Sequence, residues 1–200
     1  MRGHPPARLQ QQGERYQAVS AHVVNRNPES LTAGVSITPV ACDTMITWTQ
    51  FEQQQPALAA VGRGQFYQHG LGLGFLATVR KDGGPRVHPV CPVISKAGLH
   101  VLILAGPKRA DLRRDGRYSL HGETFAPPRE DDGFAVTGRV TETADSGPWQ
   151  VVRDQVIADF GQLWPDYDSL TLFELSLASC LLTLTQPDGT FPKGATVWKA

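Results

Sequence analysis

The chain has 200 residues, of which 40% are hydrophobic and 19% charged, and its 19 Lys and Arg balance its 19 Asp and Glu. This is ordinary globular composition, which excludes wholesale disorder, and the zero net charge argues against a nucleic-acid-binding protein. No apolar run approaches the roughly 20 residues that span a bilayer. The three cysteines, Cys42, Cys91 and Cys180, show neither CxxC pairing nor zinc-ligand spacing. We therefore expect a cytoplasmic protein of a reducing compartment, with a small-molecule partner and neither nucleic-acid nor membrane partners.

The first 44 residues differ from the rest of the chain. They are rich in Gln, Arg, Asn, Pro and Ser, and Tyr16 is their only aromatic residue. Such a segment buries too little apolar surface to fold, so we expect residues 1–44 to form a disordered or loosely packed extension. Three early arginines leave a transit peptide as an alternative. We prefer Met45 as the natural start of a single folded domain over residues 45–200.

Hydrophobic periodicity and turn residues predict the remaining elements. Thr49 with Glu52 three residues later resembles a helix capping box. The turn Asp82-Gly83-Gly84 tolerates positive φ and is typical of a tight hairpin. In chain order the sequence predicts two helices, three strands, a short helix, two strands, a long helix, one long strand or a strand pair, and a last strand. Their ranges are about 49–55, 57–68, 73–80, 86–94, 99–105, 107–114, 117–122, 133–143, 147–163, 170–185 and 195–200.

Short antiparallel strands joined by tight turns dominate this pattern. Because the strands do not alternate with long helices, a doubly wound parallel sheet is disfavoured. Six or seven such strands in about 130 residues predict a small closed or split barrel, in which closure removes exposed sheet edges. The fold class is therefore mainly β, with a few helices.

The predicted strand over about 86–94 carries residues that are unusual in a core strand. Pro89 and Pro92 cannot donate to a strand ladder, which places this strand at an edge or a bulge. An edge that carries an arginine and an imidazole predicts an anion site, and the alternative is an edge guarded against aggregation. A two-residue period assigns its side chains to opposite faces, with Arg86, His88 and Val90 on one and Val87, Pro89 and Cys91 on the other.

The segment "GPKRADLRRDG" predicts the short helix over about 107–114. Pro107 suits the first helical position, and Gly116 suits a position just past the end. Lys108 and Arg109 fall in the first turn, where the helix dipole makes cations unfavourable. An anionic ligand, above all a phosphate, would offset this penalty. The alternative is a solvated pair of cations on a surface turn.

Four stretches in order resemble the pyridoxamine 5'-phosphate oxidase-related superfamily, the FMN-binding split barrels. They are "LATVRKDGGPRVHPV", "GLHVLI", "PKRADLRRDGRYSLHG" and "GRVTE", and the resemblance covers about residues 48–200. It implies a six- to seven-stranded antiparallel Greek-key split barrel. It also implies a homodimer, with one FMN per subunit at the dimer interface.

The resemblance also assigns cofactor-binding residues. In this family the strand after the Asp-Gly turn lines the flavin and its basic residue reaches the phosphate, which here falls on His88. Lys108 matches one member of the family's second basic contact, and we expect Arg109 to compensate for Pro107, which replaces the other member. The region near Trp198 resembles the part that closes over the flavin. The expected cofactor-binding residues are Arg86, Val87, His88, Pro89, Val90, Lys108, Arg109 and Trp198.

The chain departs from the family pattern near its C-terminus. The true oxidases carry further basic residues there, whereas Lys193 and Lys199 are the only cations after residue 153, so vitamin B6 oxidation is not expected. The resemblance implies an FMN-dependent oxidoreductase with an unidentified small organic substrate. A deazaflavin-dependent reductase of the same fold and a non-enzymatic flavin- or heme-binding barrel are the alternatives. No side chain stands out as catalytic, and lone histidines on separate strands predict no metal site.

Overall fold

The structure is a computed structural model that describes residues 44–127, 129–186, 188–190 and 194–200. Apart from Thr44, the predicted N-terminal extension lies outside the described residues, as do Cys42 and Lys193. The described residues fall within one compact unit, Asp43–Ala200. The helices are α2 (Trp48–Gln54), α3 (Pro56–Phe66), α4 (Pro107–Arg114), α5 (Ser146–Phe160) and the short 3-10 helix η1 (Tyr167–Ser169). The strands are β1 (Gly74–Val79), β2 (Pro85–Val90), β3 (Val93–Ser95), β4 (Gly98–Ile103), β5 (Arg117–Gly122), β6 (Gly133–Glu142), β7 (Thr171–Thr183) and β8 (Ala195–Lys199).

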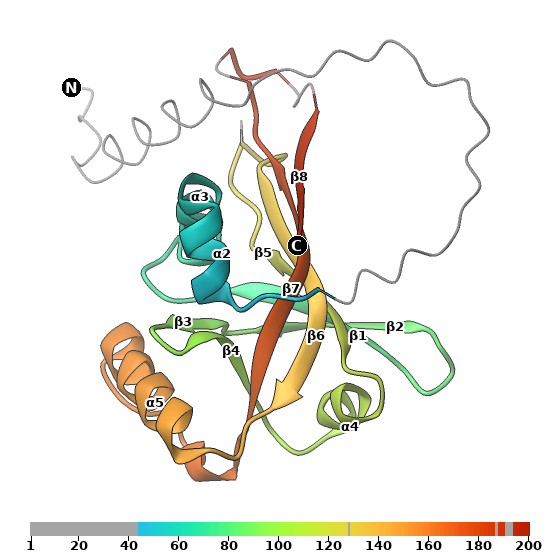
Figure 1. Ribbon diagram of the computed structural model, residues 1–200. Helices are drawn as coiled ribbons and strands as arrows, with labels where there is room; N and C mark the ends of the chain where they lie inside the picture. The colour runs from blue at the N-terminus through green and yellow to red at the C-terminus, as the bar shows by residue number, and fades with distance from the viewer. Residues whose placement is uncertain (1–43, 128, 187, 191–193) are drawn as a thin grey trace. The chain divides into compact units, whose positions relative to one another are not determined.

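All eight described strands pair antiparallel in one curled sheet, as the sequence predicts for a split barrel (Figure 1). The strand order is β2-β1-β5-β6-β7-β4-β3, and β8 also pairs with β7. The 13-residue strand β7 pairs with β6 from Phe173 to Thr183, with one register shift between Thr137 and Gly138 of β6. On its other side, β7 pairs with β4 at its start and with β8 at its end. One long strand therefore joins the barrel to its C-terminal ribbon.

The two ends of this strand order, β2 and β3, are consecutive in the chain. Only Cys91 and Pro92 separate them, and no ladder joins one to the other. The prediction of a single strand over about 86–94 was therefore wrong, and its division gives eight strands instead of seven. Pro89 and Pro92 lack the N–H groups that a continuous ladder would need, so the chain leaves one sheet edge and enters the other here. We call this break in the barrel wall the seam.

The helix α2 begins two residues earlier than the predicted capping box implies. The cap is Thr47, whose side chain accepts a hydrogen bond from the Gln50 backbone amide while the Gln50 side chain accepts one from Thr47. The predicted box of Thr49 and Glu52 was wrong, because Glu52 instead pairs with Arg63 on α3, at 2.9 Å. The two aromatic residues of α2, Trp48 and Phe51, are its buried residues.

Buried aromatic rings hold α2 and α3 against the sheet. Trp48 meets Phe51 edge-on with ring centroids 5.4 Å apart, and Phe66 meets Phe134 of β6 at 5.6 Å. All four side chains are fully buried. Edge-to-face pairs of this kind stabilise a core by about 0.5–1.5 kcal/mol beyond their buried area. The aromatic cluster therefore packs these helices against β6.

The two remaining helices follow their predicted patterns. The helix α4 spans the predicted 107–114, and Gly116 just beyond it has a φ of +72°, which glycine adopts without strain. The helix α5 ends at Gly161, which has a φ of +76°. The predicted apolar stripe packs beside β3 and β7, although α5 ends three residues before the predicted 163, so Leu163 lies beyond the helix. The stripe comprises Trp149, Val152, Val156, Phe160 and Leu163.

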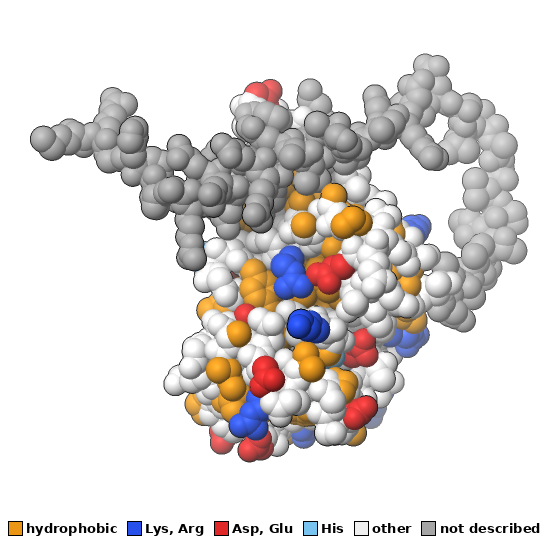
Figure 2. Space-filling view, turned by 60° about the vertical axis from the view of Figure 1, so that its left-hand side comes forward, with side chains coloured by type: hydrophobic (Ala, Val, Ile, Leu, Met, Phe, Trp, Pro, Cys, Tyr) orange, Lys and Arg blue, Asp and Glu red, His pale blue; other side chains and the backbone are white. Residues whose placement is uncertain are grey.

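Positive and negative side chains are mixed on the surface (Figure 2), in agreement with the zero net charge of the chain. Figure 2 shows a face on which Lys and Arg side chains lie among Asp and Glu, with hydrophobic side chains between them. Charges of one sign do not gather there. None of the described helices is both long and apolar enough to cross a membrane.

Candidate functional site

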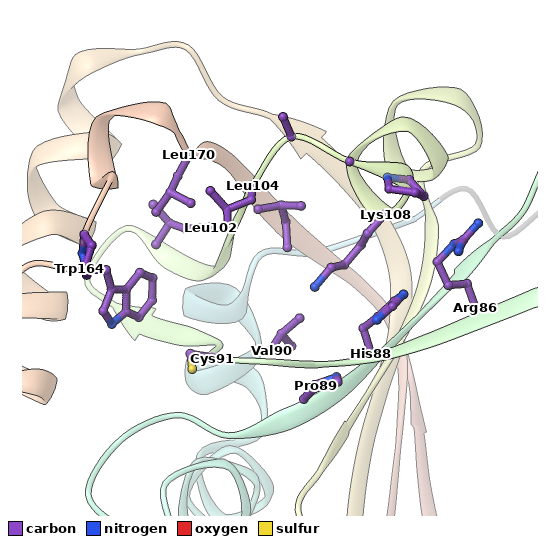
Figure 3. Close-up of a pocket in the computed structure, with 15 residues that line it drawn as sticks. Arg86, His88, Pro89, Val90, Cys91, Leu102, Leu104, Lys108, Trp164 and Leu170 are labelled. Atoms are coloured by element: carbon purple, nitrogen blue, oxygen red, sulfur yellow. The ribbon is translucent and has the colours of Figure 1, made fainter.

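A pocket of about 550 Å3 opens at the seam, between β2, the end of β4 and the start of α4 (Figure 3). Residues just after α5 and η1 complete its wall. Positively charged and apolar side chains occupy opposite ends of the pocket in Figure 3. The lining residues are Arg86, His88, Pro89, Val90, Cys91, Leu102, Ile103, Leu104, Ala105, Gly106, Pro107, Lys108, Trp164, Pro165 and Leu170.

Most of the predicted cofactor-binding residues meet in this pocket, and three do not. Arg86, His88, Pro89, Val90 and Lys108 line it. The others lie elsewhere: Val87 points out of the barrel, Arg109 donates a hydrogen bond to Thr171 Oγ1 at 3.1 Å, and Trp198 packs on Phe51 with centroids 4.8 Å apart.

The register of β2 against β1 explains which of its side chains face inward. Arg86 lies opposite Thr78, and His88 lies opposite Leu76, and both of these β1 residues are buried. Side chains of directly paired residues share a face. Arg86, His88 and Val90 therefore share the inner face, as the two-residue period predicts, while Val87 is 58% exposed on the outer one.

Lys108 lies in the first turn of α4, where backbone amides lack partners within the helix. The helix cap is Gly106, which provides no side-chain hydrogen bond, and Pro107 holds the first helical position. The next two amides, those of Lys108 and Arg109, have no acceptor within the helix. Burial lowers the pKa of the Lys108 ammonium, and nearby Cys91 opposes that effect. Among the described residues, no hydrogen bond or ion pair engages this ammonium, so it is available to a ligand.

Arg86, by contrast, has a fixed partner. Its Nε donates to Asp111 Oδ2 at 2.6 Å, and Asp111 is only 4% exposed. Asp111 also accepts hydrogen bonds from Arg114 at 3.1 Å and Thr78 at 3.3 Å. Burial alone would raise the pKa of this carboxyl, but the hydrogen bonds from Arg86 and Arg114 hold it below its usual value. The sequence analysis missed Asp111, because no local pattern links it to Arg86, 25 residues earlier in the chain.

The opposite end of the pocket is apolar and aromatic. In Figure 3, Leu102, Leu170 and Trp164 point toward the space from the side opposite Lys108. Trp164 follows α5 and meets Phe160 edge-on, with ring centroids 4.9 Å apart. The sequence analysis also missed this wall, because its residues come from segments far apart in the chain and no local pattern joins them.

The chemistry of the lining residues favours binding over acid–base catalysis. Arg86, His88, Cys91 and Lys108 are the titratable side chains among the described lining residues, and no carboxylate is among them. Burial raises the pKa of the Cys91 thiol, so this thiol is a weak nucleophile near neutral pH. Within the described part of the chain, no three His, Cys, Asp or Glu residues are grouped to hold a metal ion. The pocket suits an anion attached to a flat apolar body.

Comparison with known proteins supports the fold. No protein-family model and no curated protein matches the sequence. A heme binding protein from Mycobacterium smegmatis matches over 70% of this chain and 57% of its own, with 14% identity and a TM-score of 0.52. Campylobacter jejuni ChuZ matches over 76% and 60%, with 8% identity and a TM-score of 0.56. A NimC/NimA family protein from Clostridium acetobutylicum matches over 78% and 95%, with 13% identity and a TM-score of 0.50.

These matches define the class of fold. The chain has the split-barrel fold that the sequence resemblance to the pyridoxamine 5'-phosphate oxidase-related superfamily predicts. It spans less than two thirds of the length of the first and second of these proteins. At such low identities the likeness is one of fold, and the function has to be argued from the pocket.

Proposed function

We propose that the chain binds FMN in the pocket at the seam and is a cytoplasmic FMN-dependent oxidoreductase of a small organic substrate. The observation that carries this proposal is the convergence of Arg86, His88 and Lys108 from two elements upon the open N-terminus of α4. Cations and free helix amides together form a favourable phosphate site.

The remaining lining residues fit the rest of a flavin. Trp164, Leu102 and Leu170 offer an apolar wall for a flat ring system, and aromatic rings pack well against such surfaces. When bound, the flavin supplies two-electron redox chemistry. This chain's residues would bind the phosphate at Lys108 and Arg86, orient the ring and exclude water. Among the described lining residues, no carboxylate is available to move a proton to or from a substrate.

The first experiment is the absorption spectrum of the purified full chain, before and after FMN is added and the excess removed. Retained bands of an oxidised flavin support the proposal and justify a search for the substrate. If no flavin is retained, the same titration with a deazaflavin tests the reductase of the same fold. Failure with both cofactors would contradict the proposed function.

Heme binding without turnover is a second candidate. One structural match at a TM-score above 0.5 is described as a heme binding protein, and the His88 imidazole, a common heme iron ligand, lines the pocket. Titration of the chain with heme, followed by its absorption, tests this candidate. A spectrum that His88→Ala changes would favour heme, and identical spectra for both proteins would contradict a His88 ligand.

We also propose that the chain forms a homodimer with the flavin at its interface, and that exposed apolar residues on the outer face of the sheet belong to that interface. Phe75, Val87, Leu181 and Val197 are 41%, 58%, 40% and 56% exposed. Strand register places all four on one face, because Phe75 continues through β5 and β6 to Leu181 and Val197. Large apolar residues gathered on one face are typical of protein interfaces.

Sedimentation equilibrium of the full chain tests the dimer. Leu181→Glu should then produce monomers, because it places a charge in the buried interface. Ile157→Glu is the matched control, since Ile157 is 41% exposed on α5, away from this face. A monomeric wild type, or a dimer unaffected by Leu181→Glu, would contradict the proposal.

A further inference from the structure

We propose that Asp111 is a positioning residue of the pocket, which holds Arg86 of β2 and Lys108 of α4 at the separation that an anionic ligand requires. The inference rests on the proposed function in one respect: it assumes that the pocket takes an anion. It does not depend on that anion being FMN.

The hydrogen bond to Asp111 leaves the two terminal amino groups of the Arg86 guanidinium available to a ligand. The bond to Asp111 uses Nε, and the two terminal amino groups of Arg86 donate to no other residue that the structure describes. The Arg86 side chain is 29% exposed, and it lines the pocket. A guanidinium held by Nε has little freedom left to lose, so less entropy is lost when it binds an anion.

Asp111 also connects the two cation-bearing elements. It lies three residues after Lys108 on α4, so the two residues are neighbours on the helix surface. Through Arg86 and Thr78, its carboxylate joins this helix to β2 and β1. Arg114, one turn further along, binds the same carboxylate and the Val79 carbonyl oxygen. One buried carboxylate therefore bonds the helix that carries Lys108 to the strand that carries Arg86.

Two physical effects of Asp111 on an anion have opposite signs. Coulomb repulsion between its carboxylate and the ligand weakens binding, so loss of the charge alone would strengthen it. Loss of positioning would weaken binding, because Arg86 would be free to turn away and be solvated. Asp111→Asn keeps the shape of the side chain while it removes the charge, so the direction of the change in affinity distinguishes the two effects.

The experiment measures dissociation constants by calorimetry for the full chain and three variants: Asp111→Asn, Arg86→Ala and the double variant. The probes are FMN, inorganic phosphate and riboflavin, which lacks the phosphate. We expect Asp111→Asn to weaken FMN and phosphate by about tenfold, a factor that corresponds to about 1.4 kcal/mol, and to leave riboflavin unchanged. In the Arg86→Ala background, Asp111→Asn should no longer weaken FMN or phosphate binding, because residues that act through one another are not additive and only the loss of Coulomb repulsion is left.

Glu142→Gln is the matched control. Glu142 lies on β6 and forms an exposed ion pair with Arg113 of α4, the helix that also carries Asp111. The substitution should leave all three affinities unchanged. Tighter phosphate binding by Asp111→Asn, additive effects of the two substitutions, or equal losses of FMN and riboflavin would overturn the inference. Binding of phosphate without FMN would contradict the proposed function and still test Asp111. Binding of neither probe by the wild type would overturn both.

Discussion

Both ends of α4 carry cationic side chains, but those at the C-terminal end are paired with carboxylates and Lys108 at the N-terminal end is paired with none that the structure describes. At the C-terminal end, Arg113 donates two hydrogen bonds of 2.6 Å to Glu142, and Arg114 binds Asp111. At the N-terminal end, Lys108 has no ion pair with any described residue. The helix dipole favours cations at the first of these ends and disfavours them at the second.

This difference separates cations that stabilise the fold from those that are available for binding. The C-terminal arginines are satisfied by carboxylates and by the helix dipole, so nothing further is needed to explain them. Lys108 gains no such stabilisation, and it is partly removed from water as well. A residue that weakens its own helix and faces a pocket is best explained by a ligand.

The largest effect should come from Lys108→Ala. A hydrogen bond to a charged group contributes about 1.5–3 kcal/mol, so FMN should bind roughly 10- to 150-fold more weakly. The melting temperature of the protein without ligand should not fall, because Lys108 has no described partner to lose. Lys96, exposed in the turn between β3 and β4, supplies the control Lys96→Ala. Unchanged FMN affinity in Lys108→Ala would remove this residue from the site.

Arg114→Ala should produce the opposite pattern, in which stability falls more than affinity. It removes a hydrogen bond to the buried Asp111 carboxylate, which should lower the free energy of unfolding by about 1–2 kcal/mol. Urea denaturation measures this loss. Arg113→Ala, which breaks an exposed pair at the same end of the helix, should lower stability by less. Equal losses in the two variants would show that burial of Asp111 does not distinguish them.

A smaller effect should appear in the dependence of stability on pH. The pKa of Asp111 in the folded chain lies below its usual value of 3.8. A lowered pKa stabilises the folded state above pH 3.8, and this stabilisation is lost as the pH falls through the folded value. The urea midpoints of wild type and Asp111→Asn should therefore converge below about pH 3.8. A difference that stays constant through this range would contradict the lowered pKa.

The smallest effect should come from Arg109→Ala. Arg109 donates to Thr171 and does not line the pocket, although it shares the first turn of α4 with Lys108. Its removal should change FMN affinity by less than about twofold, well below 1.4 kcal/mol. The same titration that is used for Lys108→Ala measures it. A tenfold loss of FMN affinity would mean that both Lys108 and Arg109 bind the ligand, so the two cations of the first turn would not differ in function.

Local signals in the sequence predicted most of the fold. The helix α4 was predicted over its observed range because Pro107 and Gly116 mark its two ends chemically. The hairpin between β1 and β2 followed from Asp82-Gly83-Gly84, where Gly83 has a φ of +84°. The break at Cys91 and Pro92 was missed, because a proline signals an edge without saying that the chain crosses to the other edge.

The pocket was only half predictable, for a physical reason. Its cationic end comes from two short segments, in which Arg86, His88 and Lys108 are unusual for their positions. Its apolar end comes from Leu102, Trp164 and Leu170, which look like ordinary core residues and meet only when the barrel is formed. Asp111 was overlooked because its partner Arg86 lies 25 residues away, beyond the reach of any helical or strand period.

The seam has a consequence for local opening of the folded chain. There β2 has a ladder partner on one side, β1, and β3 has a ladder partner on one side, β4. Strands bonded on one side open more readily than strands bonded on both. Residues of β2 also line the pocket, so a ligand that binds only the closed wall would stabilise it increasingly as the ligand concentration rises above the dissociation constant. Amide hydrogen exchange in β2 should therefore slow as the ligand saturates, while exchange in the doubly bonded centre of β6 stays unchanged.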